Sequence, residues 1–289
     1  MKEKTTNNAK DKIKLLDLKN DYVFKRVFGY IGSENITKNF INSIIETKLE
    51  SINLDCKTIT EKDFRDDKFG ILDIRAKAND GTQFNIEMQM IDNKNTIERM
   101  LFYWSKLYSL TIGKGNDYKK LKPTIIIFIM NYKLEKLREI EEYCTKWRIY
   151  EEKHKNISLT NHLQFYILEL TKFDETKVAK TDKDFWIKFI KTLEVDSNMN
   201  DGENKKALTE AEKLLEKISE DENEKYLAIQ REIHQLDINS MYSQGREEGE
   251  KNKSKEIAKN MIKNNEPLEK IVNYTGLSKE EIEKLYNEK

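Results

Sequence analysis

The chain has 289 residues, with 52 basic and 52 acidic side chains and 37% hydrophobic residues. This composition supports one or two domains with a packed core, and two prolines and ten glycines argue against a loop-rich all-β fold. Cys56 and Cys144 are far apart and have no metal-ligand spacing. The sequence has no apolar leader and no apolar run of about 20 residues. We therefore expect a cytoplasmic protein without a membrane span.

Charge is distributed unevenly along the chain. Residues 1–195 contain 36 basic and 30 acidic side chains, whereas residues 196–289 contain 16 basic and 22 acidic ones. A mildly basic front part is compatible with nucleic acid but does not prove binding. The composition predicts a disordered segment at residues 1–14, an α/β domain at 15–195 and an all-helical extension at 196–289.

Two amphipathic helices and a short strand are predicted before residue 61. A helical pattern begins at Leu15, carries Val23, Val27 and Phe28 on one face, and ends at Gly29. A second helix is expected from about Glu34 to Lys48. Residues 52–60 are predicted to form a strand and residues 64–70 a turn.

A β-hairpin is predicted at residues 71–90. Apolar and polar residues alternate on both sides of Asn79-Asp80-Gly81, which is the pattern of two half-buried strands and a tight loop. A three-residue loop favours a type I turn closed by a left-handed glycine. This register pairs residues whose numbers sum to 160, so Asp73 falls opposite Glu87.

The remainder of the front domain alternates helix and strand. A helix is expected from about Asn95 to Ile112, with Met100, Leu101 and Trp104 on its apolar side. The apolar run 125–130 is typical of a strand buried on both faces, residues 164–170 predict another strand, and a helix begins near Phe185. The fold class is therefore α/β, a mixed central sheet flanked by helices.

The helical extension begins after a polar linker at residues 197–204. One amphipathic helix covers 207–218, a second carries Tyr226, Ile229, Ile233 and Leu236, and the segment 245–249 with its two glycines is expected to break it. Residues 271–285 resemble a helix–turn–helix, with Ser278 and Glu281 as a capping box. The last helix is acidic, which favours packing or dimerisation over DNA reading, although both remain open.

Asp73 and Glu87 are the first candidates for chemistry. Directly opposed side chains on one sheet face lie roughly 5 Å apart at Cβ, where two carboxylates repel. A bound divalent cation removes that penalty because magnesium takes carboxylate oxygens, and it can also activate water for phosphodiester hydrolysis. The alternative is an ordinary solvated hairpin face.

Four stretches carry a family resemblance: NDYVFKRVFG (20–29), LDIRAKANDG (72–81), NIEMQ (85–89) and ERMLFYWSKLY (98–108). Together they resemble the Rpn group, the recombination-promoting nucleases also described as transposases, within the PD-(D/E)xK superfamily. The resemblance covers roughly residues 15–195. It implies a restriction-endonuclease-like core, with Asp73 and Glu87 as metal ligands and Mg²⁺ or Mn²⁺ as cofactor.

The resemblance also implies roles for Gln89 and Asp21. Gln89 stands where the superfamily usually has lysine, so it can orient a water but supplies no positive charge. Lys77 and Lys106 are candidates to replace that charge, and Lys77 is otherwise a solvated strand residue. Asp21 is a candidate third metal ligand; its other interpretation is a first-turn acid favoured by the helix dipole.

Arg99, Tyr103 and Lys106 fall on one helix face and are candidates to contact the DNA backbone, together with Lys77. The alternative is a solvated face, or an ion pair with Glu98 or a neighbouring acid. The leading hypothesis is a magnesium-dependent DNA endonuclease, Rpn-like and a homodimer, that promotes recombination or is associated with transposition. The rival is a catalytically weak or inactive module that binds nucleic acid or a partner.

Overall fold

The computed structural model describes residues 14–45, 47–55, 74–92 and 94–287. The chain forms two compact units, Met1–Arg231 and Glu232–Lys289, and each is described by itself. The segment predicted to be disordered, except Lys14, and the turn predicted at 64–70 lie outside the described residues.

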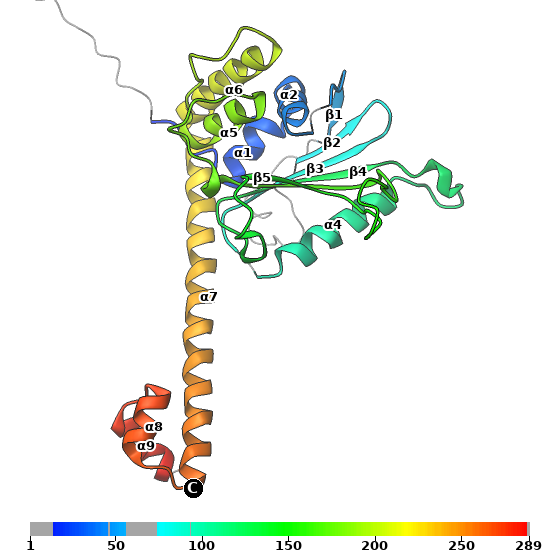
Figure 1. The fold of residues 1–289 in the computed structure, drawn as a ribbon. Helices are drawn as coiled ribbons and strands as arrows, with labels where there is room; N and C mark the ends of the chain where they lie inside the picture. The colour runs from blue at the N-terminus through cyan, green and yellow to red at the C-terminus, as the bar shows by residue number, and fades with distance from the viewer. Residues whose placement is uncertain (1–13, 46, 56–73, 93, 288–289) are drawn as a thin grey trace, which may run out of the picture. The chain divides into compact units, whose positions relative to one another are not determined.

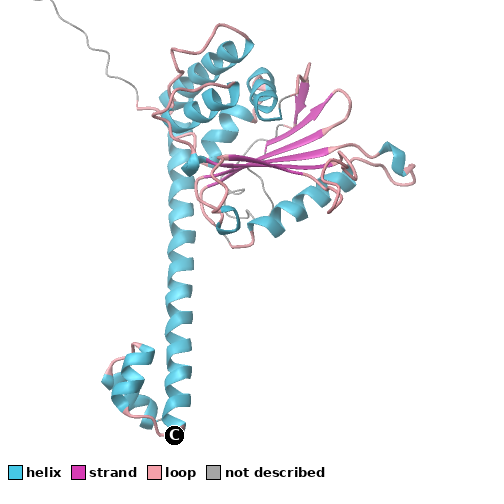
Figure 2. Ribbon diagram, viewed as in Figure 1, coloured by secondary structure: helices cyan, strands magenta, loops and turns pink. Residues whose placement is uncertain are grey.

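In the described part of the chain, a mixed six-stranded sheet forms the centre of the first unit (Figures 1 and 2). Its strands lie in the order β1-β2-β3-β4-β6-β5. β3 pairs with β4 and β4 with β6 in parallel, whereas the other three pairs are antiparallel. The bounds are β1 Ile52–Leu54, β2 Ile74–Ala78, β3 Gln83–Gln89, β4 Thr124–Met130, β5 Cys144–Trp147 and β6 Leu163–Glu169.

The hairpin has the predicted register. Ile74 pairs with Ile86, and Lys77 with Gln83, so the numbers of each pair sum to 160. Gly81 has a φ of +91°, a conformation that glycine adopts without the steric cost of a Cβ. The loop thus fixes which β3 side chains share a face.

Helices cover both faces of the sheet (Figure 2). On one face, α1, α2, α5 and α6 enclose the larger core, in which Trp186 of α5 packs against Phe28, Phe40 and Phe189. On the other face, Met100 of α4 lies in a second core with Phe128. The bounds are α1 Asp21–Phe28, α2 Glu34–Ile45, α4 Thr96–Leu110, α5 Asp182–Thr192 and α6 Glu203–Glu220. The short 3₁₀ helices among the described residues are η1 Tyr118–Lys120, η2 Glu135–Leu137 and η3 Leu170–Lys172.

The fully buried strand and the layered α/β pattern predicted from sequence are confirmed, because all seven residues of β4 are buried. Two helix predictions were wrong in detail. α1 begins at Asp21 rather than Leu15, since the side chain of Asn20 accepts hydrogen bonds from the backbone of Tyr22 and Val23 and caps the helix there. Leu101 of α4 is 47% exposed rather than on the packed side. β5 was not predicted, because its short segment is only partly buried.

The first unit continues past residue 195 because α6 is part of its core. Ala207, Leu208 and Leu215 of α6 are buried with the residues of α1 and α2. The N-terminal end of α7, Glu222–Lys263, is also held there: Tyr22 Oη donates a hydrogen bond to Glu224 Oε2 over 2.7 Å, and Asn20 Nδ2 donates to the Ala228 carbonyl over 3.0 Å. The linker predicted at 197–204 is therefore a connection within a packed unit.

The second unit is a small helical module with its own core. Ala258 and Ile262 of α7 pack with Ile271 of α8, Leu268–Thr275, and Ile282 of α9, Lys279–Asn287. The predicted capping box is confirmed: Ser278 and Glu281 exchange backbone-to-side-chain hydrogen bonds of 3.0 and 3.2 Å. The predicted break at residues 245–249 was wrong, because α7 runs unbroken through both glycines. An exposed helix tolerates glycine at a modest cost.

Candidate active site

Glu87 lies in the middle of β3, on the sheet face that α4 covers. In the parallel register it is beside Phe128 of β4, which belongs to the core under α4. The Glu87 side chain is only 4% exposed. A carboxylate removed from water to this extent requires counter-charge or hydrogen-bond donors. The period-two pattern of the sequence predicts the face but not the depth of burial.

Arg99 and Gln89 both contact the same oxygen of Glu87. The Arg99 guanidinium forms an ion pair with Glu87 Oε1 through Nη2. Gln89 Nε2 donates a hydrogen bond of 2.7 Å to Oε1 from two residues along the strand. Two donors, one of them charged, therefore stabilise the ionised form of a buried carboxylate.

Two hydroxyl groups line the same region. Thr96, at the start of α4, and Tyr132, just after β4, form a 2.9 Å hydrogen bond between their hydroxyls. Burial raises the pKa of Tyr132 to about 12; the hydrogen bond with Thr96 opposes this, and the charges of Asp92, Arg99 and Glu87 act more weakly. Tyr132 is therefore a protonated hydroxyl at neutral pH. The sequence offered no signal for it, because a tyrosine after a strand has many ordinary roles.

Asp73, the predicted partner of Glu87, lies outside the described residues. Within the described ranges, no group of three or more His, Cys, Asp or Glu side chains is arranged to hold a metal ion. Glu87 is thus the one member of the predicted carboxylate pair whose surroundings are described.

Asp21 is held by an arginine from α7. Arg231 donates to both carboxylate oxygens of Asp21 over 2.6 to 3.0 Å, and the two side chains are 8% and 15% exposed. Asp21 Oδ1 also accepts from the backbone of Tyr22. These contacts are what a structural acid at a helix start would make, and a metal ion at Asp21 would compete with Arg231.

The predicted DNA contacts lie on two elements. On α4, the Arg99 guanidinium carbon is 5.4 Å from the centroid of the Tyr103 ring, and Lys106 Nζ is 5.5 Å from that of Phe102. Lys77 is exposed on β2. Of these four residues, Arg99 is the one with a direct contact to Glu87. Arg99 thus forms an ion pair, and the acid is Glu87 of β3 rather than Glu98, the acid named from the sequence.

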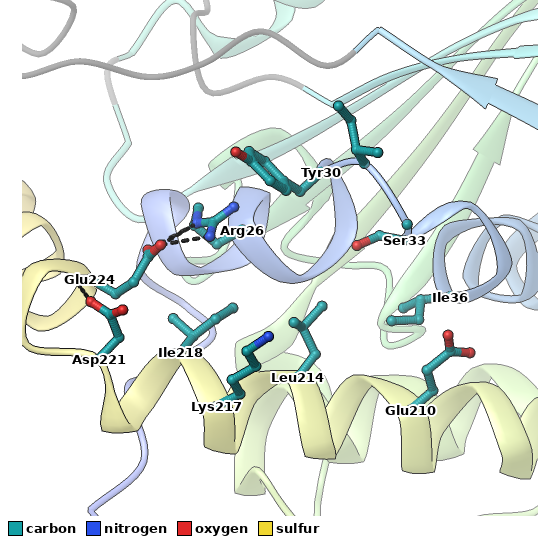
Figure 3. Close-up of a pocket in the computed structure, with 12 residues that line it drawn as sticks. Arg26, Tyr30, Ser33, Ile36, Glu210, Leu214, Lys217, Ile218, Asp221 and Glu224 are labelled. Atoms are coloured by element: carbon teal, nitrogen blue, oxygen red, sulfur yellow. Dashed lines mark hydrogen bonds and ion pairs between the residues drawn. The ribbon is translucent and has the colours of Figure 1, made fainter.

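A cavity of about 380 Å³ lies elsewhere in the first unit, between the α1–α2 connection and α6 (Figure 3). Arg26 lies along one wall, forms an ion pair of 2.6 Å with Glu224, and has its guanidinium carbon 3.9 Å from the centroid of the Tyr30 ring. Three carboxylates and two cations line this cavity, and none of the predicted site residues does. It is therefore separate from the candidate active site.

The mixed sheet, the helices on both faces and a buried glutamate on the second strand of the hairpin define an α/β protein with a PD-(D/E)xK nuclease-like core. The family model for PD-(D/E)XK nuclease family transposases matches residues 18–245, and the chain belongs to that family. No curated protein and no solved structure gave a significant match. None of the described helices is long and apolar enough to cross a membrane.

Membership of this family indicates the general class of function. The chain has a nuclease- or transposase-like domain, for which DNA is the expected class of substrate and divalent metal ions are the usual cofactors. The match continues well past residue 195, through α6 and into α7. α6 and the first part of α7 are therefore within the family domain, which agrees with the place of α6 in the core of the first unit.

Proposed function

We propose that this protein is a metal-dependent DNA endonuclease that hydrolyses phosphodiester bonds. The observation that carries the proposal is the buried carboxylate of Glu87, which the resemblance of the sequence to the PD-(D/E)xK motif implies as an acid of the site. The pattern of the sequence pairs Asp73 with Glu87 across the hairpin. Carboxylate oxygens in that arrangement suit magnesium or manganese.

Each residue of the motif has its own proposed role. Asp73 and Glu87 would hold the metal, which when bound supplies an activated water and offsets charge on the phosphate. The side-chain amide of Gln89 is oriented by the hydrogen bond that its Nε2 donates to Glu87. Its side-chain oxygen, Oε1, could then accept a hydrogen bond from a water. Asp21 is not needed in this arrangement, because its pairing with Arg231 accounts for its charge. Arg99, Tyr103, Lys106 and Lys77 are proposed to contact the DNA backbone.

A second function is a binding module that does not cut. The specific observation in its favour is that Arg99 and Gln89 already bond to one oxygen of Glu87, so the buried carboxylate has a counter-charge without a metal. Such a module would bind nucleic acid through the same cations and would need no metal.

Nicking of supercoiled plasmid by Mg²⁺- or Mn²⁺-loaded protein separates the two functions. The wild-type protein should convert plasmid to open circles, EDTA should stop it, and Asp73→Asn should remove it because one ligand of the pair is lost. Glu98→Gln is the matched control, since Glu98 is an exposed acid on the first turn of α4. Metal-dependent nicking that survives Asp73→Asn would place the reaction elsewhere. Absence of nicking with either metal, together with plasmid binding, would favour the binding module.

We further propose a homodimer, which would supply two sites for two DNA strands and suit a role in recombination or transposition. Four α7 residues repeat with the 3-4-3 spacing of a coiled-coil seam, and each is about half exposed: Tyr226 48%, Ile229 51%, Ile233 46% and Leu236 59%. A second copy of the same helix would bury this stripe by packing apolar residues between the two.

Two charges in the stripe should dissociate the dimer. The variant Ile229→Glu/Ile233→Glu keeps helix-forming residues but places carboxylates in the seam, so its mass by sedimentation should fall to that of one chain. Tyr242→Glu adds the same charge to an exposed position of α7 off the seam and should stay dimeric. A wild-type protein that sediments as one chain at tens of micromolar would contradict the proposal.

A further inference from the structure

The contact between Arg99 and Glu87 joins a predicted DNA-binding residue to a predicted metal ligand. Glu87 is nearly inaccessible, at 4% exposure, whereas the Arg99 side chain is 32% exposed and reaches it from α4. The guanidinium bonds to Oε1, and Gln89 bonds to the same atom. A buried acid from the sheet is thus neutralised by a partly solvated base from the covering helix.

A guanidinium and a divalent cation bound at the same buried carboxylate repel each other, whichever of its two oxygens each contacts. A magnesium ion binds a carboxylate oxygen at about 2.0 to 2.1 Å, and a charged N–H donor at about 2.7 to 2.9 Å. Sharing one oxygen would bring a double and a single positive charge within a few ångströms in a poorly solvated place, where repulsion is strong. Binding of one therefore weakens binding of the other.

We propose that Arg99 is the resident counter-charge of Glu87 and competes with the metal, so that metal loading displaces the guanidinium from the carboxylate. This inference rests on the proposed metal-dependent function. In the metal-free protein, Arg99 compensates the buried charge. In the loaded protein, the same side chain becomes available for a DNA phosphate.

The surroundings of Arg99 suit such an exchange. Its long side chain is one-third exposed, so it can turn toward solvent without opening the core. The Tyr103 ring, one helical turn along α4, offers its face to the guanidinium at 5.4 Å and can retain it near the site.

Metal binding by the Arg99→Gln variant tests the exchange directly. Mn²⁺ alone, titrated calorimetrically at fixed pH and ionic strength, should bind Arg99→Gln at least about fivefold more tightly than wild type, because the competing cation is gone. A merely structural arginine would leave the affinity unchanged or lower it. Without metal, Arg99→Gln should have a lower melting temperature than wild type. Added Mn²⁺ should raise the melting temperature of Arg99→Gln by more than it raises that of wild type. Arg138→Gln is the control, since it removes a 66% exposed arginine paired with Glu135.

A measurement on the wild-type protein guards against a variant that does not fold. The NMR signal of the Arg99 Nε–H group can be assigned by its absence from the spectrum of Arg99→Lys. Titration with Mg²⁺ should move this signal toward the chemical shift of a solvated arginine. Wild-type metal binding with an unmoved Arg99 signal, or with unchanged affinity in Arg99→Gln, overturns the exchange but leaves the proposed function intact. A wild-type protein that binds neither Mn²⁺ nor Mg²⁺ overturns both.

Discussion

Glu87→Gln is expected to abolish metal-dependent DNA cutting, with a loss of about 10³-fold or more. The amide keeps the size of the side chain but cannot supply the negative charge that a divalent ion requires. The metal is expected to stabilise the transition state by several kcal/mol, and each loss of about 1.4 kcal/mol lowers the rate tenfold. Single-turnover nicking of plasmid at saturating Mg²⁺ measures the effect.

The same substitution should lower stability only moderately. Arg99 loses its ionic partner, but it is one-third exposed and can be solvated, so we expect about 1–2 kcal/mol rather than the full cost of breaking a buried pair. Urea unfolding measures this, and Glu98→Gln should change neither cutting nor stability. Undiminished cutting by a folded Glu87→Gln protein would remove the basis of the proposed site.

The second prediction concerns the pair formed by Asp21 and Arg231. Asp21→Asn and Arg231→Gln should each lower the free energy of unfolding by about 2–4 kcal/mol, because each leaves a largely buried charge without its partner. The double variant should lose much less than the sum of the two, since the contact is already broken by either change. Urea unfolding of all four proteins completes the cycle. Asp201→Asn, which alters a 96% exposed acid, should leave stability unchanged.

Metal affinity distinguishes the two roles of Asp21. With a structural role, Mn²⁺ should bind Asp21→Asn as tightly as it binds the wild-type protein. A selective loss of Mn²⁺ affinity in Asp21→Asn, without a comparable loss in Arg231→Gln, would instead make Asp21 a metal ligand. The pair also ties α1 to α7, so its stability effect would explain why the family domain continues beyond residue 195.

Local patterns in the sequence were sufficient for the hairpin and for the buried strand. Alternation around Asn79-Asp80-Gly81 determines which side chains share a face, and the turn length determines the register, so both could be derived without the rest of the chain. β4 was recognisable because seven consecutive buried positions leave an apolar run. The family resemblance came from short stretches in order, and the family match agrees with it.

The sequence by itself therefore determined the hairpin and its register, the buried strand β4, the family and the identity of the candidate acids Asp73 and Glu87. Only the tertiary structure decided that Arg99 meets Glu87, that Asp21 meets Arg231, and that α6 completes the core of the first unit. The physical reason is that these contacts join side chains from different elements. Local periodicity reports which face of an element is apolar, but the partner of a buried charge depends on how separate elements pack.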